Sequence, residues 1–395
     1  KKVYEEEKDR YTKGLHRISE IAKGVETVLT KIGKQEPTVG EVENFKPTND
    51  REEKGRAALL SALTKSIKLD MTNVKPDISF IITMNALTQT ATADSCQKML
   101  HSFIDYYSKY LNYHLNTDFD TRKTVVMDNY EKINDISYGN NNVKGPSAGH
   151  GSHVAGIIAA MRNNNIGIKG VADNVRIMVL RVVPDGDERD KDVANAIRYA
   201  ADNGAKVINM SFGKAWSWNK KAVDEAAKYA SDKDVLLVHA AGNDNKDLEK
   251  FYNYPSDQFE GTEDVIPNWI EVGASSWLKG KLIPASFSNY GMETVDLFAP
   301  GVDIYSTVPD TNKYDSYDGT SMASPVTAGA AALIRSYYPR LTASQVKEIL
   351  MKSVTPVKGK VKMPGKKDKV KMKMLCKTGG IVNVYNALTL AEKYK

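Results

Sequence analysis

Short apolar runs rich in β-branched residues alternate with helical patterns after residue 120. The candidate strands are residues 124–127, 176–182, 207–211, 235–240, 269–273 and 295–298, with helical patterns such as 193–203 and 220–231 between them. Such alternation predicts βαβ units joined by right-handed crossovers, in a parallel sheet flanked by helices on both faces. We therefore expect an α/β fold whose chemistry gathers at the carboxyl ends of the strands.

The first 118 residues have a different pattern, which is helical and rich in Lys and Glu. Apolar residues recur at spacings of three and four between Leu15 and Ile32, as on one face of a helix. Further helices are predicted at about 50–67 and 94–115, the last with Asp94 or Ser95 as its N-cap. No cofactor motif occurs here. We interpret residues 1–118 as a mostly helical insertion or accessory region and residues 119–395 as the α/β domain.

Composition excludes several classes of protein. Hydrophobic residues make up 41% and charged residues 26% of the chain, as in ordinary folded domains. The net charge of +6 comes partly from a lysine-rich stretch at 358–373, which we interpret as a solvated surface loop and not as a nucleic-acid site. With only Cys96 and Cys376, no disulfide framework is expected. No apolar run reaches the roughly 18 residues that a transmembrane segment needs.

The strongest chemical signal is the segment Gly319-Thr320-Ser321-Met322-Ala323-Ser324-Pro325, which leads into an apolar, alanine-rich helical run. A serine at a helix N-terminus has its hydroxyl beside free N–H groups and the positive end of the helix dipole. Both favour a developing negative charge. A lone serine in this position is more often an ordinary N-cap, but the length of the match favours a nucleophile.

The second signal is the segment His150-Gly151-Ser152-His153-Val154-Ala155-Gly156 before a further apolar helix. We expect His150 in the first turn, where its imidazole can meet a hydroxyl as general base. His153 lies one turn on and is expected to be packed. A third and weaker signal is Asn243, which follows the strand at 235–240 and can donate its amide to an oxyanion. An asparagine in an ordinary turn is the alternative.

These three segments, in this order, resemble the diagnostic blocks of the subtilase family of serine proteases. Residues 207–213, 285–291 and 299–302 add further matches, so the resemblance runs from about residue 124 to 388. It implies a subtilisin-like sheet with His150 as base, Ser321 as nucleophile and Asn243 in the oxyanion hole. Ser152 replaces the family's usual Thr, which should not affect catalysis.

The resemblance also implies a groove for a peptide or protein substrate. The segment Ser211-Phe212-Gly213 would be the edge strand that pairs with substrate backbone, and Ala240-Ala241-Gly242 would line the primary specificity pocket. The loop at 185–192 would border the pockets for residues before the cleaved bond, where its carboxylates favour basic side chains. The alternatives for this loop are a solvated turn with Asp192 capping the next helix, or a structural calcium site.

The aspartate of the triad is the main departure from the family. Subtilases place it before the histidine, at the end of a strand and followed by Ser or Thr and then Gly, and no such tripeptide precedes His150. The chain more closely resembles long subtilases of Bacteroidota, in which a helical insertion separates the aspartate from the histidine. Because Lys1 already lies in a helical pattern and no signal peptide is recognisable, we interpret the chain as part of a longer precursor.

On this interpretation the aspartate belongs to an N-terminal fragment of the same precursor. The first alternative is Asp128, which ends the apolar residues 125–127, and the second is a triad without its acid. Loss of the acid costs on the order of ten-thousandfold in rate.

The sequence therefore predicts a serine endopeptidase that works through an acyl-enzyme and needs no metal or other cofactor. The alternative is a catalytically impaired pseudoprotease, in which the groove acts as a peptide-binding or assembly scaffold. Relatives of the Bacteroidota branch are exported, so the resemblance implies an extracellular or cell-envelope protein, in some relatives as a surface-anchored lipoprotein.

Overall fold

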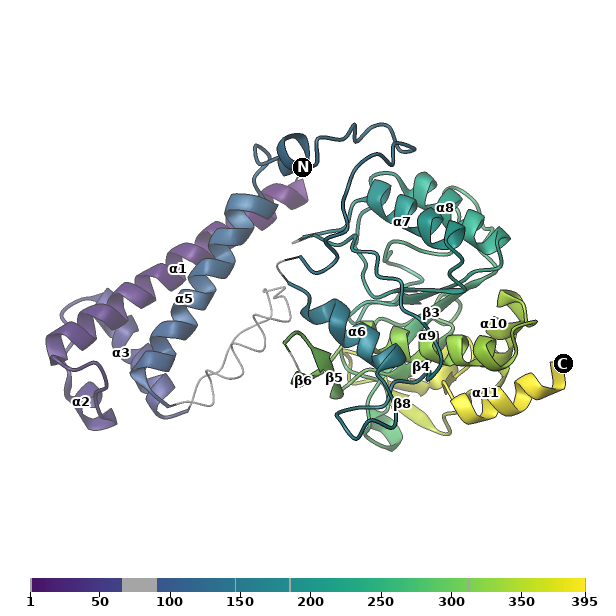
Figure 1. Cartoon of the computed structure of the whole chain (residues 1–395). Coiled ribbons are helices and arrows are strands. Elements are labelled where there is room, and N and C mark those ends of the chain that lie inside the picture. The colour runs from purple at the N-terminus through teal and green to yellow at the C-terminus, as the bar shows by residue number, and fades with distance from the viewer. Residues whose placement is uncertain (1, 66–90, 146, 185, 311–312, 395) are drawn as a thin grey trace. The chain divides into compact units, whose positions relative to one another are not determined.

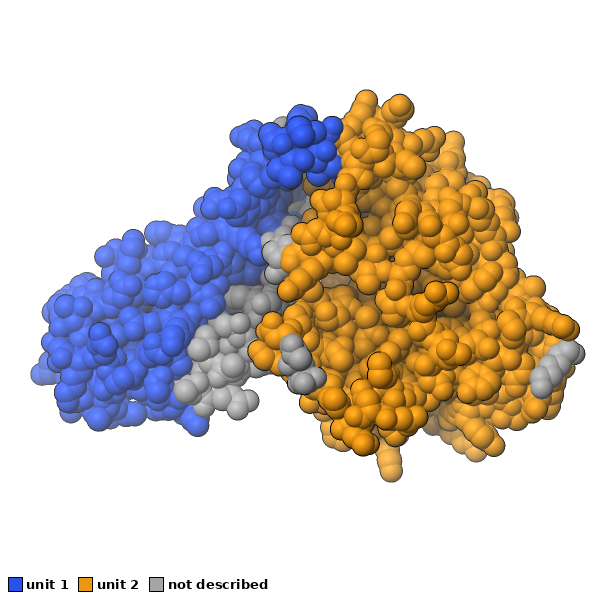
Figure 2. All heavy atoms as spheres, in the orientation of Figure 1, with its two compact units in different colours: residues 1–127 blue, residues 128–395 orange. Residues whose placement is uncertain are grey.

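The computed structural model describes residues 2–65, 91–145, 147–184, 186–310 and 313–394. These residues form two compact units, 1–127 and 128–395, which Figure 2 shows in blue and orange. Each unit has a hydrophobic core of its own, so the two are described separately.

The N-terminal unit is helical, as the sequence predicts. Its helices are α1 (Lys2–Ile32), α2 (Val39–Asn44), α3 (Asp50–Leu63) and α5 (Ala93–Lys109), followed by single π-helical turns at Tyr110–His114 and Arg122–Val126. The core between α1, α3 and α5 contains Val25, Leu59 and Leu100. The predicted cap of α5 is wrong by two or three residues, because Thr92 is the N-cap and shares a reciprocal capping box with Ser95.

The C-terminal unit is built on a six-stranded sheet of order β1-β2-β3-β4-β10-β7, which is parallel except for the β10–β7 pair. Its strands are β1 (Val207–Met210), β2 (Leu236–Ala240), β3 (Trp269–Ser275), β4 (Leu297–Pro300), β7 (Thr355–Pro356) and β10 (Gly380–Ile381). Side chains of β2 and β3 are buried along their whole length. A parallel sheet covered on both faces is the predicted architecture.

Helices cover both faces of this sheet (Figure 1). On one face α7 (Asp190–Asp202) and α8 (Lys220–Asp232) pack around Met210, Leu237 and Trp269. On the other, α9 (Thr320–Tyr337) crosses β1 to β4 and shares a core with α10 (Ala343–Lys352) and α11 (Val384–Ala391). Helix α6 (Gly149–Ala159) packs against α9.

The remaining elements are small. A hairpin pairs β5 (Ile304–Val308) with β6 (Lys313–Tyr317), and a second pairs β8 (Lys360–Lys362) with β9 (Lys369–Lys371). Single 3-10 turns lie at Gly280–Leu282, Met372–Met374 and Glu392–Tyr394. The lysine-rich stretch therefore includes a β-hairpin and not only a loop, because Val361 and Met372 bury their side chains beneath it.

Two predicted strands are wrong. Residues 122–126 form a π-helical turn, and Val125 and Met127 are 71% and 75% exposed. Residues 176–182 form no regular element and pair with no strand of the described chain, and the side chains of Ile177, Met178 and Val179 are 42 to 50% exposed. Apolar β-branched runs form a strand only where they pair with a neighbouring strand, and neither run is paired in the described part of the chain.

Candidate active site

Ser321 is the second residue of α9, as expected for a nucleophile at a helix N-terminus. The helix begins after Gly319, whose φ of +155° favours glycine, and a Cβ there would lie 3.5 Å from both the Asn243 amide nitrogen and the Ser321 backbone nitrogen. The backbone N–H of Ser321 has no acceptor among the described residues, as is usual in a first helical turn. This N–H is free to donate to a substrate oxygen.

The side chain of Asn243 is fixed next to this N–H. Its Oδ1 accepts hydrogen bonds from the backbone N–H and the hydroxyl of Thr320, both at 2.9 Å. Thr320 Oγ1 in turn accepts from Gly242 N at 3.0 Å. Because Oδ1 is already used twice, the Asn243 Nδ2 amide is the group left to point into the site. Asn243 Nδ2 and Ser321 N–H are therefore a pair of donors with the chemistry of an oxyanion hole.

Ser321 also contacts the end of β1. Its hydroxyl donates to Ser211 O at 3.2 Å, and Ser211 Oγ donates to Ser321 O at 2.8 Å. Asn209 stabilises this contact, because its Nδ2 donates to Ser211 Oγ and its Oδ1 accepts from Ser324 Oγ. The reciprocal bonds tie the start of α9 to the segment that follows β1.

His150 lies in the first turn of α6 and is partly buried. No hydrogen bond joins its imidazole to a carboxylate within the described ranges. Burial, reinforced by the nearby His153, lowers the pKa of His150 to about 4. The imidazole is therefore neutral at pH 7, which is the state that a general base requires.

The hairpin β5–β6 connects α6 to the nucleophile. His153 is fully buried, stacks on Tyr317 with ring centroids 4.2 Å apart, and meets Asp315 O at 3.1 Å. Ser306 Oγ donates to His153 O at 2.8 Å. Tyr317 precedes Ser321 by only four residues, which span at most roughly 14 Å of chain. The packed role predicted for His153 is thus confirmed, and its contacts attach α6 to the hairpin that leads into α9.

No hydrogen bond or ion pair joins Asp128 to His150 in the described part of the chain. Its carboxylate meets the Lys191 ammonium at 2.5 Å, and both side chains are at most 1% exposed. Lys191 also donates to Asn129 O at 2.7 Å. A buried carboxylate with a buried cation as partner serves packing, and this contact argues against the use of Asp128 as the acid of the triad.

The two predicted substrate segments face a common side chain, that of Asn253. Residues 211–213 follow β1, the edge strand of the described sheet, and residues 240–242 end β2. Asn253 Nδ2 donates to Ala240 O at 3.0 Å, and a Cβ on Gly213 would lie 2.5 Å from Asn253 Oδ1. The sequence alone did not mark Asn253, because an isolated Asn before Tyr-Pro is an ordinary turn signal.

Asn289 stabilises the loop at residues 241–246, which contains Asn243. Its side chain is buried, its Nδ2 donates to Ala241 O at 2.8 Å, and its Oδ1 accepts from the backbone N–H of Asp244 and Lys246. Gly242 has φ +100°, and a Cβ there would lie 2.5 Å from Asn289 Nδ2. The sequence indicates a family-like segment at residues 285–291 but no separate role for Asn289. Only the fold brings Asn289 into contact with residues 241–246.

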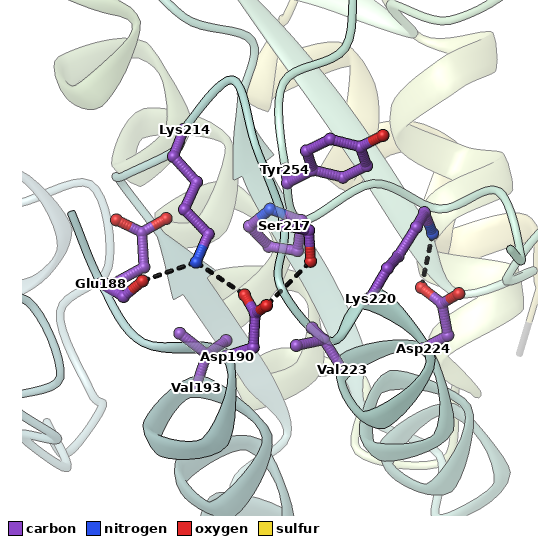
Figure 3. Close-up of a pocket in the computed structure, with 10 residues that line it drawn as sticks. Glu188, Asp190, Val193, Lys214, Ser217, Lys220, Val223, Asp224 and Tyr254 are labelled. Atoms are coloured by element: carbon purple, nitrogen blue, oxygen red, sulfur yellow. Dashed lines mark hydrogen bonds and ion pairs between the residues drawn. The ribbon is translucent and has the colours of Figure 1, made fainter. Parts of the chain in front are cut away.

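The described part of the acidic loop at 185–192 is held by protein cations and donors around a small pocket (Figure 3). The Asp190 carboxylate accepts from Lys214 Nζ at 2.6 Å, Ser217 Oγ at 2.9 Å and Asn219 N at 2.6 Å. Glu188 is buried, and burial raises the pKa of its carboxyl group. The predicted cap is wrong, because Arg189 is the N-cap of α7, while Asp192 accepts from Tyr138 OH.

No cluster of three or more His, Cys, Asp or Glu side chains suited to a metal ion occurs in the described ranges. No helix among the same residues is long and apolar enough to cross a membrane.

Comparisons with known proteins agree with this geometry. The profile of the subtilase family (Peptidase S8) matches residues 70–373. Subtilisin DY from Bacillus licheniformis is 42% identical over 211 residues, which cover 52% of this chain and 70% of that protein. Thermitase from Thermoactinomyces vulgaris is 42% identical over 189 residues, covering 48% of this chain and 61% of thermitase.

A solved structure gives the same result. Fervidolysin from Fervidobacterium pennivorans, a keratinolytic enzyme related to subtilisin, has a TM-score of 0.50 and 30% identity, covering 61% of this chain and 36% of its own. The chain thus spans less than two thirds of thermitase and of fervidolysin. Since the family profile covers most of the 395 residues, the chain belongs to the subtilase family of serine proteases.

Proposed function

We propose that the chain supplies the base, the nucleophile and the oxyanion hole of a serine endopeptidase that works through an acyl-enzyme. The observation that carries this proposal is the start of α9, where the Ser321 backbone N–H has no acceptor among the described residues and Thr320 holds the Asn243 amide next to it. A structural N-cap would use its hydroxyl on the helix, whereas Ser321 Oγ donates outward to Ser211 O. A purely binding role needs no such arrangement.

The reaction follows from these groups. A substrate strand pairs with residues 211–213, and its scissile carbonyl oxygen enters the space between Asn243 Nδ2 and Ser321 N–H. Neutral His150 takes the proton from Ser321 Oγ as the oxygen attacks the carbonyl carbon, and then gives that proton to the leaving amine. Water, activated by the same imidazole, hydrolyses the acyl-enzyme and restores Ser321. No cofactor takes part, and any calcium would be structural.

We further propose that the acid of the triad comes from a partner segment, an N-terminal fragment of the same precursor. His150 has no carboxylate partner within the described ranges, and Asp128 is engaged by Lys191. Without an acid on Nδ1 the imidazole is not held in the tautomer that accepts the serine proton. The partner must therefore bring a carboxylate to the start of α6.

The β1 side of the sheet supports an extended partner. The outer edge of β1 pairs with no described strand, and the backbone of residues 173–184 forms no hydrogen bond with the backbone of other described residues. This run is anchored at both ends, by the bond from Ala172 N to Ile158 O and by packing of Val182 against the core that includes Met210. An unpaired backbone edge and exposed apolar side chains are suited to binding an apolar strand. We propose that the partner supplies this strand and that the strand ends in the Asp of the triad.

We also propose that residues 119–395 form the peptidase domain, that residues 1–118 are an accessory insertion, and that the protein is exported to the extracellular space or the cell envelope, as subtilisins are. The proposed boundary between residues 118 and 119 is close to the division between the compact units, which falls between residues 127 and 128. Substrates would be peptides or proteins that present an extended backbone to residues 211–213.

A serine-directed fluorophosphonate probe tests the proposal. We expect labelling of Ser321 that disappears in Ser321→Ala and persists in Ser336→Ala, a control at the far end of α9 that is exposed to solvent. Absence of labelling in folded protein co-purified with its partner would favour the scaffold function. For the partner, native mass spectrometry of protein from its source should reveal a second, bound polypeptide. The substitution Val179→Pro, which removes a backbone N–H donor, should weaken the binding of that polypeptide. A single chain would overturn the partner proposal.

A further inference from the structure

His239 is a buried histidine that the reaction above does not use. It lies in β2, one residue before the predicted specificity segment, and is fully buried. Its Nε2 lies 2.8 Å from Phe212 O, the carbonyl at the centre of the predicted substrate strand. Its Nδ1 lies 2.9 and 3.0 Å from the two carboxylate oxygens of Glu271. One imidazole thus bridges β3 and the wall of the groove.

Both neighbours of the ring are acceptors. A carbonyl oxygen accepts only, so Nε2 must carry a proton to hold Phe212 O, and Nδ1 must carry one to bond an ionised Glu271. A ring protonated on both nitrogens, the imidazolium form, fits these two acceptors. The Glu271 carboxylate, together with the Phe212 carbonyl, raises the pKa of His239 despite its burial. This state is the opposite of that of His150, whose pKa is lowered.

The groups around His239 hold its partner, the Glu271 carboxylate, in place. Trp269 Nε1 donates to Glu271 Oε2 at 2.9 Å, so the carboxylate cannot rotate freely. Glu188 adds a further attraction for the imidazolium, and Lys214 lies beside Glu188. Asp257 and Asp296 lie behind Glu271, where burial raises the pKa of both; for Asp257 it is raised to about 6. These groups set the charge balance of the site.

We propose that His239 is a positioning residue, which holds the Phe212 carbonyl and thereby fixes the height and tilt of residues 211–213 for substrate pairing. A strand adds to an edge only if the edge backbone keeps its register and orientation. Residues 211–213 lie beyond the end of β1, so sheet hydrogen bonds do not fix them. The charge-assisted bond from His239 does, and Ser211 is fixed separately by Ser321. The inference rests on the proposed protease function.

Two matched variants separate the halves of the imidazole. His239→Gln keeps a donor near the place of Nε2 and can still bond Phe212 O, whereas His239→Asn keeps a donor near Nδ1 and can bond only Glu271. Each is combined with Glu271→Gln to balance charge, and with Ser321→Ala so that a bound peptide is not cleaved. We measure the Kd of an extended fluorescent peptide and hydrogen exchange of residues 211–214.

We expect His239→Asn to weaken peptide binding about tenfold and to speed exchange at residues 211–214, and His239→Gln to stay close to the parent. Equal loss in both variants, or no loss in either, would overturn the inference, because a structural ion pair would not distinguish them. Peptide binding does not require the triad, and fluorophosphonate labelling does not require His239. Failure of one proposal is therefore distinguishable from failure of the other.

Discussion

The Asn243 carboxamide oxygen accepts two hydrogen bonds from Thr320, one from the backbone N–H and one from the hydroxyl. This pair orients the amide that is proposed to bind the oxyanion. Thr320 thus acts through Asn243 without touching substrate, and the residue directly before the nucleophile has a role of its own.

Replacement of Thr320 by Val removes one of the two bonds that orient Asn243 and also the acceptor for Gly242 N. We expect kcat to fall about tenfold with KM nearly unchanged, since the lost orientation matters most in the transition state. Thr320→Ser keeps the hydroxyl and is the control. Asn243→Ala should lower kcat by roughly 10²- to 10³-fold, the range known for such a donor in subtilisin itself. Equal activity of Thr320→Val and parent would show that Asn243 needs no such support.

Asn253 is expected to limit the size of the primary specificity pocket. Its side chain lies between Ala240 O and Gly213, so Asn253→Gly opens space between the two substrate segments. We compare two peptides that have Phe or Ala directly before the cleaved bond. The kcat/KM for the Phe peptide, divided by that for the Ala peptide, should rise about tenfold. Asn253→Gln, which adds a methylene, should shift the ratio the other way. Unchanged ratios in both variants would place Asn253 outside the pocket.

The Asp128–Lys191 pair is expected to serve stability. Both side chains are buried, so Lys191→Met removes the cation that faces a buried carboxylate and should lower the free energy of unfolding by about 3 to 5 kcal/mol. Denaturant titration measures this loss. Fluorophosphonate labelling of Asp128→Asn under native conditions should stay within a few-fold of the parent rate. A loss of several thousandfold in a folded variant would instead identify Asp128 as the acid of the triad.

The pH dependence of labelling should follow the lowered pKa of His150. In the chain without its acid partner, the neutral imidazole predominates above about pH 4, so the labelling rate should be flat from pH 6 to 8 and fall as His150 gains a proton near pH 4. A carboxylate from the partner favours the charged ring, so the midpoint should move upward on assembly. A midpoint that stays near 4 after the partner binds would mean that no carboxylate reaches His150.

Most of the sheet could be predicted from the sequence because β2, β3 and β4 are short, buried and mainly apolar runs bounded by turn residues. The runs at 124–127 and 176–182 are also apolar, but neither pairs with a described strand, so the prediction of strands from composition failed there. Strand pairing depends on neighbours that are distant in sequence, and no local pattern contains them.

The candidate site shows the same division. His150, Ser321 and Asn243 carry local motifs and could be named from the sequence. Asn253 and His239 could not, since their roles arise from contacts across 13 to 40 residues of chain with Ala240, Gly213 and Phe212. Such contacts exist only once β1 and β2 lie side by side.

The proximity of His150 and Ser321 is the central claim, and a peptide chloromethyl ketone tests it directly. Such a reagent alkylates an imidazole efficiently only when a neighbouring serine oxygen holds its carbonyl as a hemiketal. After reaction and digestion, mass spectrometry should find the adduct on His150 in the parent protein and lose it in Ser321→Ala. Modification of His150 at equal rates in both proteins, or of other histidines alone, would contradict the account.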